Sequence, residues 1–421
     1  MRPAIVLLTI VLMLICAPLT GAAEDRSELL NNYLEKGDLW GAEKEFGKLV
    51  AADPKDEQAR FALAVVKTMR AVEARAQEFY KYGPDFFLRP MIVPGSRLPV
   101  EETKEPEKIS YAKLRRLVKS FVEDLDEALE VLDGMKGSEF RLNVRFGMAR
   151  MDLDGDGEAT DDETLWKVWS AMNPQVVRSQ GSREEFEQKA VEFVIGFDAA
   201  DAHWLRAYLN LISGVCEAGL AHDSEELFNH TAQLFFPNVD TPYPYLQNAD
   251  GGQQGIDDFG HIADIITFIH LYSFECEDPE LMKKAHSRLL TAVGESRETW
   301  HKLLVETDNV NEWIPNPNQT AAIPGARVTE EMADSWLLLL DEVETLLKGE
   351  KLIPFWRGND GRGVNLKKVF TDPTRFDLVK WIQGTGADPY LEQGTLTEPD
   401  FWNRIDRVFS GEFLGFAVWV N

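Results

Sequence analysis

The sequence predicts a mainly α-helical, multi-helix fold, and three observations lead to this prediction. Apolar residues recur at every third or fourth position over long blocks, which is the period of a helix with one buried face. Outside one ambiguous stretch before residue 150, strand-like patterning is limited to the closing run FAVWV. The chain has 421 residues, 44% of them hydrophobic, which is enough to bury a core in about two or three domains.

The first 23 residues differ from the rest of the chain. One arginine precedes an apolar run over 4–17, and a proline and small residues follow over 18–23. The run is too short to span a bilayer comfortably and ends in a cleavage-like pattern. It therefore predicts a signal peptide over 1–23 and an exported protein, either periplasmic or secreted. The alternative is an uncleaved N-terminal membrane anchor, and the remainder of the chain predicts no stable membrane span.

The charge balance excludes some classes of partner. The formal net charge is −27, from 71 acidic and 44 basic residues. Nucleic acids need a basic surface for their phosphates, so the sequence predicts no nucleic-acid partner. The same excess of acid disfavours an anionic membrane surface and suits a soluble, calcium-rich space outside the cytoplasm.

Residues 24–108 are expected to form repeat-like helices followed by a connector. Helical periodicity runs over 24–82 with a break at Gly37-Asp38, and the Pro-rich stretch 84–108 has no clear period. The window 23–56 resembles a tetratricopeptide repeat, and the window from residue 57 resembles it in part. This resemblance rests on Leu29, Tyr33, Ala42, Phe46 and Pro54, then on Leu63, Ala64, Ala76 and Tyr80. It implies a protein partner bound through the N-terminal helices, whereas an ordinary antiparallel helix pair would imply none.

Residues 109–172 are expected to contain a helix over 109–133 and then an unusually acidic stretch. Residues 152–163 read D-L-D-G-D-G-E-A-T-D-D-E, in which seven of twelve side chains are carboxylates and none is basic. Such a density of like charge repels itself, so it needs a cation, basic neighbours or water around it. The aspartates alternate, and a glycine and a final glutamate stand at fixed distances from them.

This stretch resembles the calcium-binding loop of the EF-hand family, D-x-[DN]-x-[DN]-G-x5-E. The resemblance covers the twelve residues and their flanks and implies that Ca²⁺ is the cofactor. Gly157 would allow the tight turn that a β-carbon obstructs. The resemblance implies the metal ligands Asp152, Asp154, Asp156, Glu158 through its carbonyl, Thr160 through a water or its hydroxyl, and Glu163 through two oxygens.

The flanks of the loop fit the family unequally. After the loop, Leu165, Trp166 and Trp169 share one helical face, as an exiting helix requires. Before the loop, residues 142–151 fit either a helix or a strand. Ala159 stands where the family usually has a branched apolar residue, and no second loop follows. An unpaired loop predicts a structural role rather than a sensor role. The alternatives are a solvated acidic loop that binds nothing, and Mg²⁺, which resists an all-protein cage.

Residues 173–421 are expected to form a larger, irregular helical C-terminal domain of unknown role. Long irregular stretches interrupt it at 237–256, 308–327, 353–365 and 384–399, and ordered loops of this length are often functional. Two local groups could hold a metal or transfer protons, although helix capping and local hydrogen bonds would explain them equally. These groups are Asp198, Asp201 and His203, and Asp257, His261 and Asp264. Two tryptophans beside loops, Trp313 and Trp356, could line a glycan or peptide cleft.

The sequence as a whole favours an exported, non-enzymatic calcium-binding protein in which the ion orders the junction between two helical parts. One alternative is a hydrolase of envelope glycan or peptide with a site near the 237–261 loop. Another is a tetratricopeptide-type scaffold. Cys216 and Cys276 are expected either to form a disulfide or to remain separate thiols.

Overall fold

The computed structural model describes residues 26–83, 103–135, 137, 139–172, 183–247, 257–322, 327–358 and 361–409. This part of the chain is mainly helical, which confirms the predicted fold class. The expected signal peptide, the closing FAVWV run, most of the Pro-rich connector and residues 248–256 lie outside these ranges. Within them, no helix combines the length and the apolar character that crossing a membrane requires.

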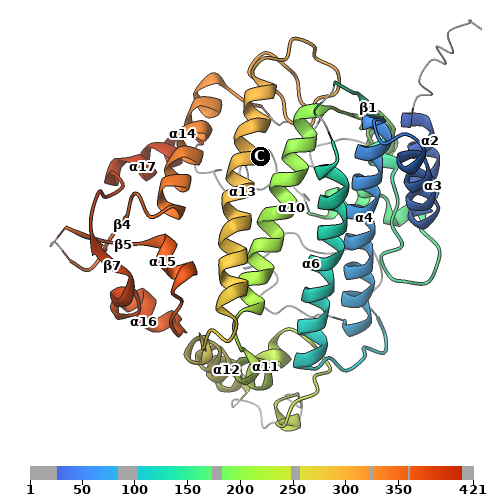
Figure 1. The fold of residues 1–421 in the computed structure, drawn as a ribbon. Helices are drawn as coiled ribbons and strands as arrows, with labels where there is room; N and C mark the ends of the chain where they lie inside the picture. Colours follow the sequence, from blue (N-terminus) through green and yellow to red (C-terminus); the bar gives the residue numbers. More distant parts are fainter. Residues whose placement is uncertain are drawn as a thin grey trace, which may run out of the picture.

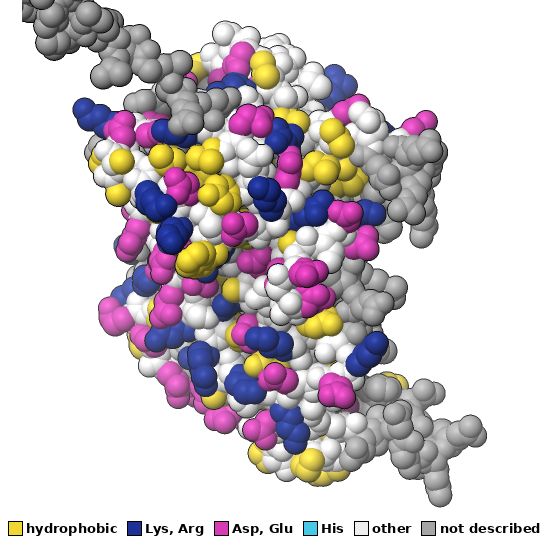
Figure 2. Space-filling view, turned by 90° about the vertical axis from the view of Figure 1, so that its right-hand side faces the viewer, with side chains coloured by type: hydrophobic (Ala, Val, Ile, Leu, Met, Phe, Trp, Pro, Cys, Tyr) yellow, Lys and Arg dark blue, Asp and Glu magenta, His cyan; other side chains and the backbone are white. Residues whose placement is uncertain are grey.

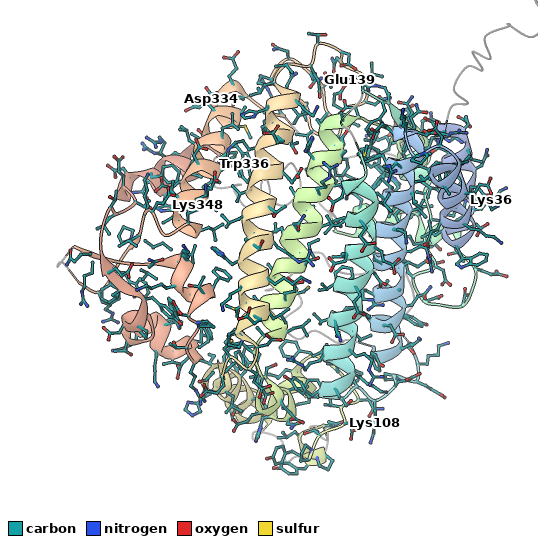
Figure 3. The ribbon with its side chains drawn as sticks, viewed as in Figure 1. Lys36, Lys108, Glu139, Asp334, Trp336 and Lys348 are labelled. Carbon is teal, nitrogen blue, oxygen red and sulfur yellow. The ribbon has the colours of Figure 1, made fainter. Side chains whose placement is uncertain are left out.

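Four long helices lie side by side in a row and form the centre of the molecule (Figure 1). In order along the row, the helices are α4 (Glu57–Tyr82), α6 (Tyr111–Asp133), α10 (Ala199–Leu220) and α13 (Pro279–Leu303). Lys108 and Glu139, labelled in Figure 3, lie near opposite ends of α6.

The starts of these long helices follow from their sequences. Each helix is preceded by a residue whose side-chain oxygen accepts a backbone N–H of the first turn, which satisfies a donor that the helix itself cannot pair. The α4 helix ends at Gly83, whose φ of 54° places it in the left-handed region that favours glycine. The four N-terminal caps are Asp56, Ser110, Asp198 and Asp278.

The N-terminal helices α2 (Arg26–Leu34) and α3 (Leu39–Ala52) pack against α4. The turn between them contains Gly37, which has a φ of 68°. Lys36 lies at this turn in Figure 3. Figure 2 faces this side of the molecule and shows acidic and basic side chains interspersed over it.

The largest buried cluster spans much of the sequence. It joins Phe46 of α3 and Phe61 of α4 to Leu132 of α6, to Leu209 of α10 and to Trp166, which follows the acidic stretch. The cluster therefore contains residues on both sides of positions 108 and 172, where sequence analysis places domain boundaries. Because burial of apolar surface is the main stabilising contribution, these segments depend on one another for stability.

Short strands supplement the helices. The strand β1 (Leu142–Val144) lies in the stretch whose sequence fits either a helix or a strand, whereas the other strands lie where the sequence predicts helix or irregular chain. The strand β2 (Ile195–Phe197) separates α9 (Arg183–Glu192) from α10 and pairs antiparallel with β1 (Leu142–Val144). Strands of two or three residues are too short to show a period of two in the sequence. The others are β3 (Ser273–Phe274) with β6 (Phe376–Asp377), and β4 (Ile353–Pro354), β5 (Arg362–Val364) and β7 (Leu391–Gln393) in one sheet.

A second group of helices packs on the far side of α13 and at one end of the row (Figure 1). Trp336 points toward α13 in Figure 3, and its indole N–H donates to Ser296 Oγ at 3.2 Å. The helices of this second group are α11 (Glu225–Thr231), α12 (Asp257–Leu271), α14 (Glu330–Leu347), α15 (Leu366–Thr371), α16 (Leu378–Gln383) and α17 (Pro399–Val408).

The two cysteines for which the sequence left a disulfide or separate thiols open, Cys216 and Cys276, are both free thiols.

Candidate metal centre

The acidic stretch 152–163 forms a compact loop on the outer side of α4. Its entering segment is not a helix: β1 is followed by a single 3-10 turn, η1 (Phe146–Met148), and then by extended chain. An antiparallel bridge between Arg150 and Thr164 closes the base of the loop. The amide of Leu165 donates to the Ala149 carbonyl at 2.8 Å, so the loop leads directly into α7 (Leu165–Met172).

Three aspartates converge at the exposed end of the loop. Asp152, Asp154 and Asp156 each offer a carboxylate oxygen, and these three oxygens lie within 4.8 Å of one another. Asp152 shapes the turn, because its Oδ1 accepts the Gly155 N–H at 2.7 Å and its Oδ2 accepts the Gly157 N–H at 3.0 Å. Both glycines have positive φ values, 78° and 92°, which only glycine adopts without strain.

The local hydrogen bonds leave oxygen lone pairs available on each aspartate. Asp154 Oδ1 accepts the Asp156 N–H at 3.1 Å, and Asp156 Oδ1 accepts the Glu158 N–H at 2.8 Å. Partial burial and the charges of Asp156, Glu163 and Asp152 raise the pKa of Asp154, against a hydrogen bond that lowers it. The aspartates therefore repel one another, and a cation would relieve this repulsion.

Glu163 connects two parts of the loop through the hydrogen bonds of its carboxylate. Its side chain is buried, with the residue only 2% exposed. Oε1 accepts the Leu153 N–H at 2.7 Å, while Oε2 accepts both the N–H and the hydroxyl of Thr160 at 2.8 Å. The bond between Thr160 and Glu163 is part of a capping box that starts the 3-10 turn η2 (Asp161–Glu163). Glu158, the remaining expected ligand, is exposed.

The acidic loop packs against the turn between α2 and α3. A β-carbon on Gly37 would collide with the Ala159 methyl group, so these two residues are in direct contact. The amide of Arg150 also donates to the Leu34 carbonyl at 2.9 Å. Ala159 therefore lies directly against the turn, with its methyl group facing Gly37.

Helix α4 holds the first residue of the loop. Glu73 Oε1 accepts the Asp152 N–H at 2.9 Å, and Gln77 Nε2 donates to the Asp152 carbonyl at 2.8 Å. Burial raises the pKa of Glu73 to about 7, and the negative charges of Asp152 and Glu163 add to this effect. No sequence motif identifies Glu73 and Gln77, because they lie 75 or more positions before the loop.

The three aspartate oxygens lie close enough together to share one hard cation such as Ca²⁺. Calcium bonds to oxygens at about 2.3–2.6 Å, so two oxygens on opposite sides of the ion are about 4.6–5.2 Å apart. Three carboxylate oxygens within 4.8 Å of one another are compatible with one such shell. No family model, curated protein or solved structure matches this chain.

A second acidic cluster lies between the start of α10 and the loop that follows α13. Oxygens of Asp198, Glu306 and Glu312 lie within 4.8 Å of one another. Arg141 offsets part of this charge, because it lies 3.9 Å from both Asp198 and Glu312 and pairs with Asp308. Burial and the neighbouring Asp198 charge raise the pKa of Glu306 to about 7. Asp198 lies more than 100 positions before Glu306 and Glu312 in the sequence, so no sequence motif could bring the three together.

The other residues singled out from the sequence have different surroundings. Asp201 forms a capping box with Asp198 at the start of α10, and burial raises its pKa well above its usual range. His203 instead faces α13, where its Nδ1 lies 2.6 Å from Glu295 Oε2. The side chains of Asp257 and His261 are outside the described residues.

The two tryptophans beside loops, Trp313 and Trp356, differ in their surroundings. Trp313 packs among aromatic side chains of the main core, with ring centroids 5.5 Å from Trp204 and 5.8 Å from Phe146. Trp356 is 50% exposed, and its indole N–H donates to the Ile382 carbonyl at 3.2 Å. Trp313 is therefore a packing residue, whereas Trp356 lies at the surface.

Proposed function

We propose that this chain is a calcium-binding protein in which the EF-hand-like loop 152–163 holds one Ca²⁺ with a structural role. The convergence of three aspartate oxygens within 4.8 Å carries the proposal. Asp152, Asp154 and Asp156 would hold the ion through their carboxylates. By the family resemblance, the Glu158 carbonyl, Thr160 and Glu163 would complete the shell. The bound cation would offset the negative charge of the loop, while the hydrogen bonds with Glu73 and Gln77 would keep the loop docked on α4.

A structural role agrees with how the loop is attached. Calcium sensors respond by changing the angle between an entering and an exiting helix, usually within a pair of loops. This loop has an exiting helix, α7, but its entering segment is a 3-10 turn and extended chain. Its outer side packs on the α2–α3 turn through Ala159 and Gly37. In the exported setting that residues 1–23 predict, a weak site with a dissociation constant of about 0.1–1 mM would be filled.

Thermal unfolding of chelator-treated protein tests the proposal. With 10 mM CaCl₂ and a dissociation constant of about 0.1–1 mM, the ion should stabilise the folded state by about 1.4–2.7 kcal/mol. The melting temperature should therefore rise by a few degrees. Asp156→Asn should remove most of the rise, because it removes the negative charge of a proposed ligand. Asp156 is exposed and its hydrogen bond is local, so the change should disturb the fold little. Glu163→Gln should also reduce it.

Asp162→Asn is the matched control for this experiment. It removes one negative charge from the same loop at an exposed position outside the expected ligand set, where the nearest cation is Lys167 Nζ at 3.8 Å. This variant should keep most of the calcium-dependent rise. The calcium proposal fails if the parent protein shows no shift at 10 mM Ca²⁺, or if Mg²⁺ gives an equal shift at the same concentration.

A further inference from the structure

The first ligand of an EF-hand loop normally comes at the end of an entering helix, which fixes its direction. In this chain the residues before Asp152 form a strand, a 3-10 turn and extended chain instead. We propose that Glu73 and Gln77 of α4 act as positioning residues that orient Asp152 for calcium. This inference rests on the proposed function and extends it to residues outside the loop.

The two side chains hold both polar backbone atoms of one residue. Glu73 and Gln77 are four positions apart, so they lie on the same face of α4. Glu73 Oε1 accepts the Asp152 N–H at 2.9 Å, and Gln77 Nε2 donates to the Asp152 carbonyl at 2.8 Å. With both groups fixed, the backbone of Asp152 has little freedom to rotate. Its carboxylate is therefore held toward Asp154 and Asp156.

Gln77 also supports a second part of the turn. Its Cβ, Cγ and Cδ atoms lie 3.5–3.7 Å from where a β-carbon on Gly155 would be. Gly155 in turn donates its N–H to Asp152 Oδ1 at 2.7 Å. The side-chain stem of Gln77 thus packs against the glycine that orients the Asp152 carboxylate, while its amide holds the Asp152 backbone.

Calcium affinity and the docking of α4 should consequently be linked. If α4 holds Asp152 in the binding geometry, the ion binds more tightly when α4 is docked. By thermodynamic reciprocity, the bound ion must stabilise the docking of α4 by the same factor. Residues that orient metal ligands typically alter affinity by about 10-fold or more, and a single neutral hydrogen bond by somewhat less.

Calorimetric titration of Ca²⁺ into chelator-treated full-length protein tests this inference, at a temperature where every variant is folded. Gln77→Met keeps the stem against Gly155 but removes the amide donor, and it should weaken binding about five- to tenfold. The matched control is Gln58→Met on the same helix. Gln58 Nε2 donates to the Arg141 carbonyl at 2.6 Å, away from the loop, so its loss should leave the dissociation constant within about twofold.

A second pair of variants separates the hydrogen bond of Glu73 from its charge. Glu73→Gln retains an acceptor for the Asp152 N–H, whereas Glu73→Met retains none. Calcium binding should be weaker in Glu73→Met than in Glu73→Gln. Calcium should also slow amide hydrogen exchange in α4 of the parent protein, and it should do so less in Gln77→Met.

The possible results distinguish this inference from the proposed function. If Gln77→Met and Glu73→Met bind calcium as tightly as the parent, α4 does not position the loop, although calcium binding stands. If Gln58→Met weakens binding as much as Gln77→Met, the effect is general destabilisation and the inference is also wrong. If the parent protein binds no calcium, the proposed function and this inference fail together.

Discussion

Glu306 shows how a single carboxyl group can be kept partly protonated near neutral pH. It is half-buried, and the negative charges of Asp198, Glu312 and Asp308 face it. Its hydrogen bond from Gln319 Nε2 is long, at 3.4 Å. The nearest compensating cation in this cluster, Arg141, interacts with Asp198, Asp308 and Glu312. Burial and repulsion therefore dominate and raise the pKa of Glu306 to about 7.

The raised pKa of Glu306 predicts that stability falls as the pH rises through about 7. The ordinary value of this group is 4.5, so the folded state holds the proton more tightly than the unfolded state. This contribution is fully present below about pH 4.5 and is lost above about pH 7. Urea unfolding at about pH 5.5 and 8 without divalent cations measures it. Glu306→Gln should reduce the difference in unfolding free energy between the two pH values. An unchanged difference would contradict the raised pKa of Glu306.

For single residues, the sequence predicts sites whose members are close together in the chain. It does not predict sites whose members come together only through folding. The expected ligands Asp152, Asp154 and Asp156 are neighbours in a regular pattern, and the structure brings them together. The sequence places Asp198 beside Asp201 and His203, whereas in space Glu306 and Glu312 lie close to it. No short-range pattern encodes a contact across more than 100 residues.

The turn between α2 and α3 is the element that most clearly constrains the loop. Its Gly37 contacts Ala159 directly, and the neighbouring Leu34 carbonyl accepts the Arg150 N–H. Position 159, where the EF-hand pattern usually has a branched apolar residue, is the position that meets this turn. The helical elements were predictable because they are long and periodic, whereas the short strands and this turn-to-loop contact depend on tertiary pairing.

Enlarging Ala159 should destabilise the protein even though the change moves toward the EF-hand consensus. Ala159→Val adds two methyl groups against Gly37, and overpacking of this kind typically costs about 1–3 kcal/mol. Ala159→Ser, which adds one atom, should cost less. Chemical denaturation with calcium present and absent would measure both. A valine variant as stable as the parent would show that the turn can move away from the loop.

On the scale of the whole molecule, three helices of the central row are joined by one guanidinium group. Arg288 of α13 donates to Glu217 of α10 at 2.9 Å and to both oxygens of Asp126 of α6 at 2.6 and 2.8 Å. Glu217 is only 1% exposed, so its charge depends on this partner and on Lys284 Nζ at 2.7 Å. The arrangement fixes the positions of α6, α10 and α13 relative to one another.

Arg288→Met should destabilise the fold by about 3 kcal/mol, because it leaves a buried carboxylate with reduced compensation. Arg297→Met provides the comparison on the same helix. Arg297 pairs with Asp341 and Glu344 of α14 in a more exposed setting, and its loss should cost about 1 kcal/mol or less. Equal unfolding free energies for the two variants in urea would contradict this interpretation.

The hold of α4 on Asp152 also has a consequence for the order of events in folding. Its two hydrogen bonds close chain segments of 79 and 75 residues, and contacts between distant parts of a chain are slow to form. The acidic turn can reach its final shape only after α4 has assembled with its neighbours. An ion bound by this turn would therefore bind late in folding, and it would slow unfolding more than it would speed folding.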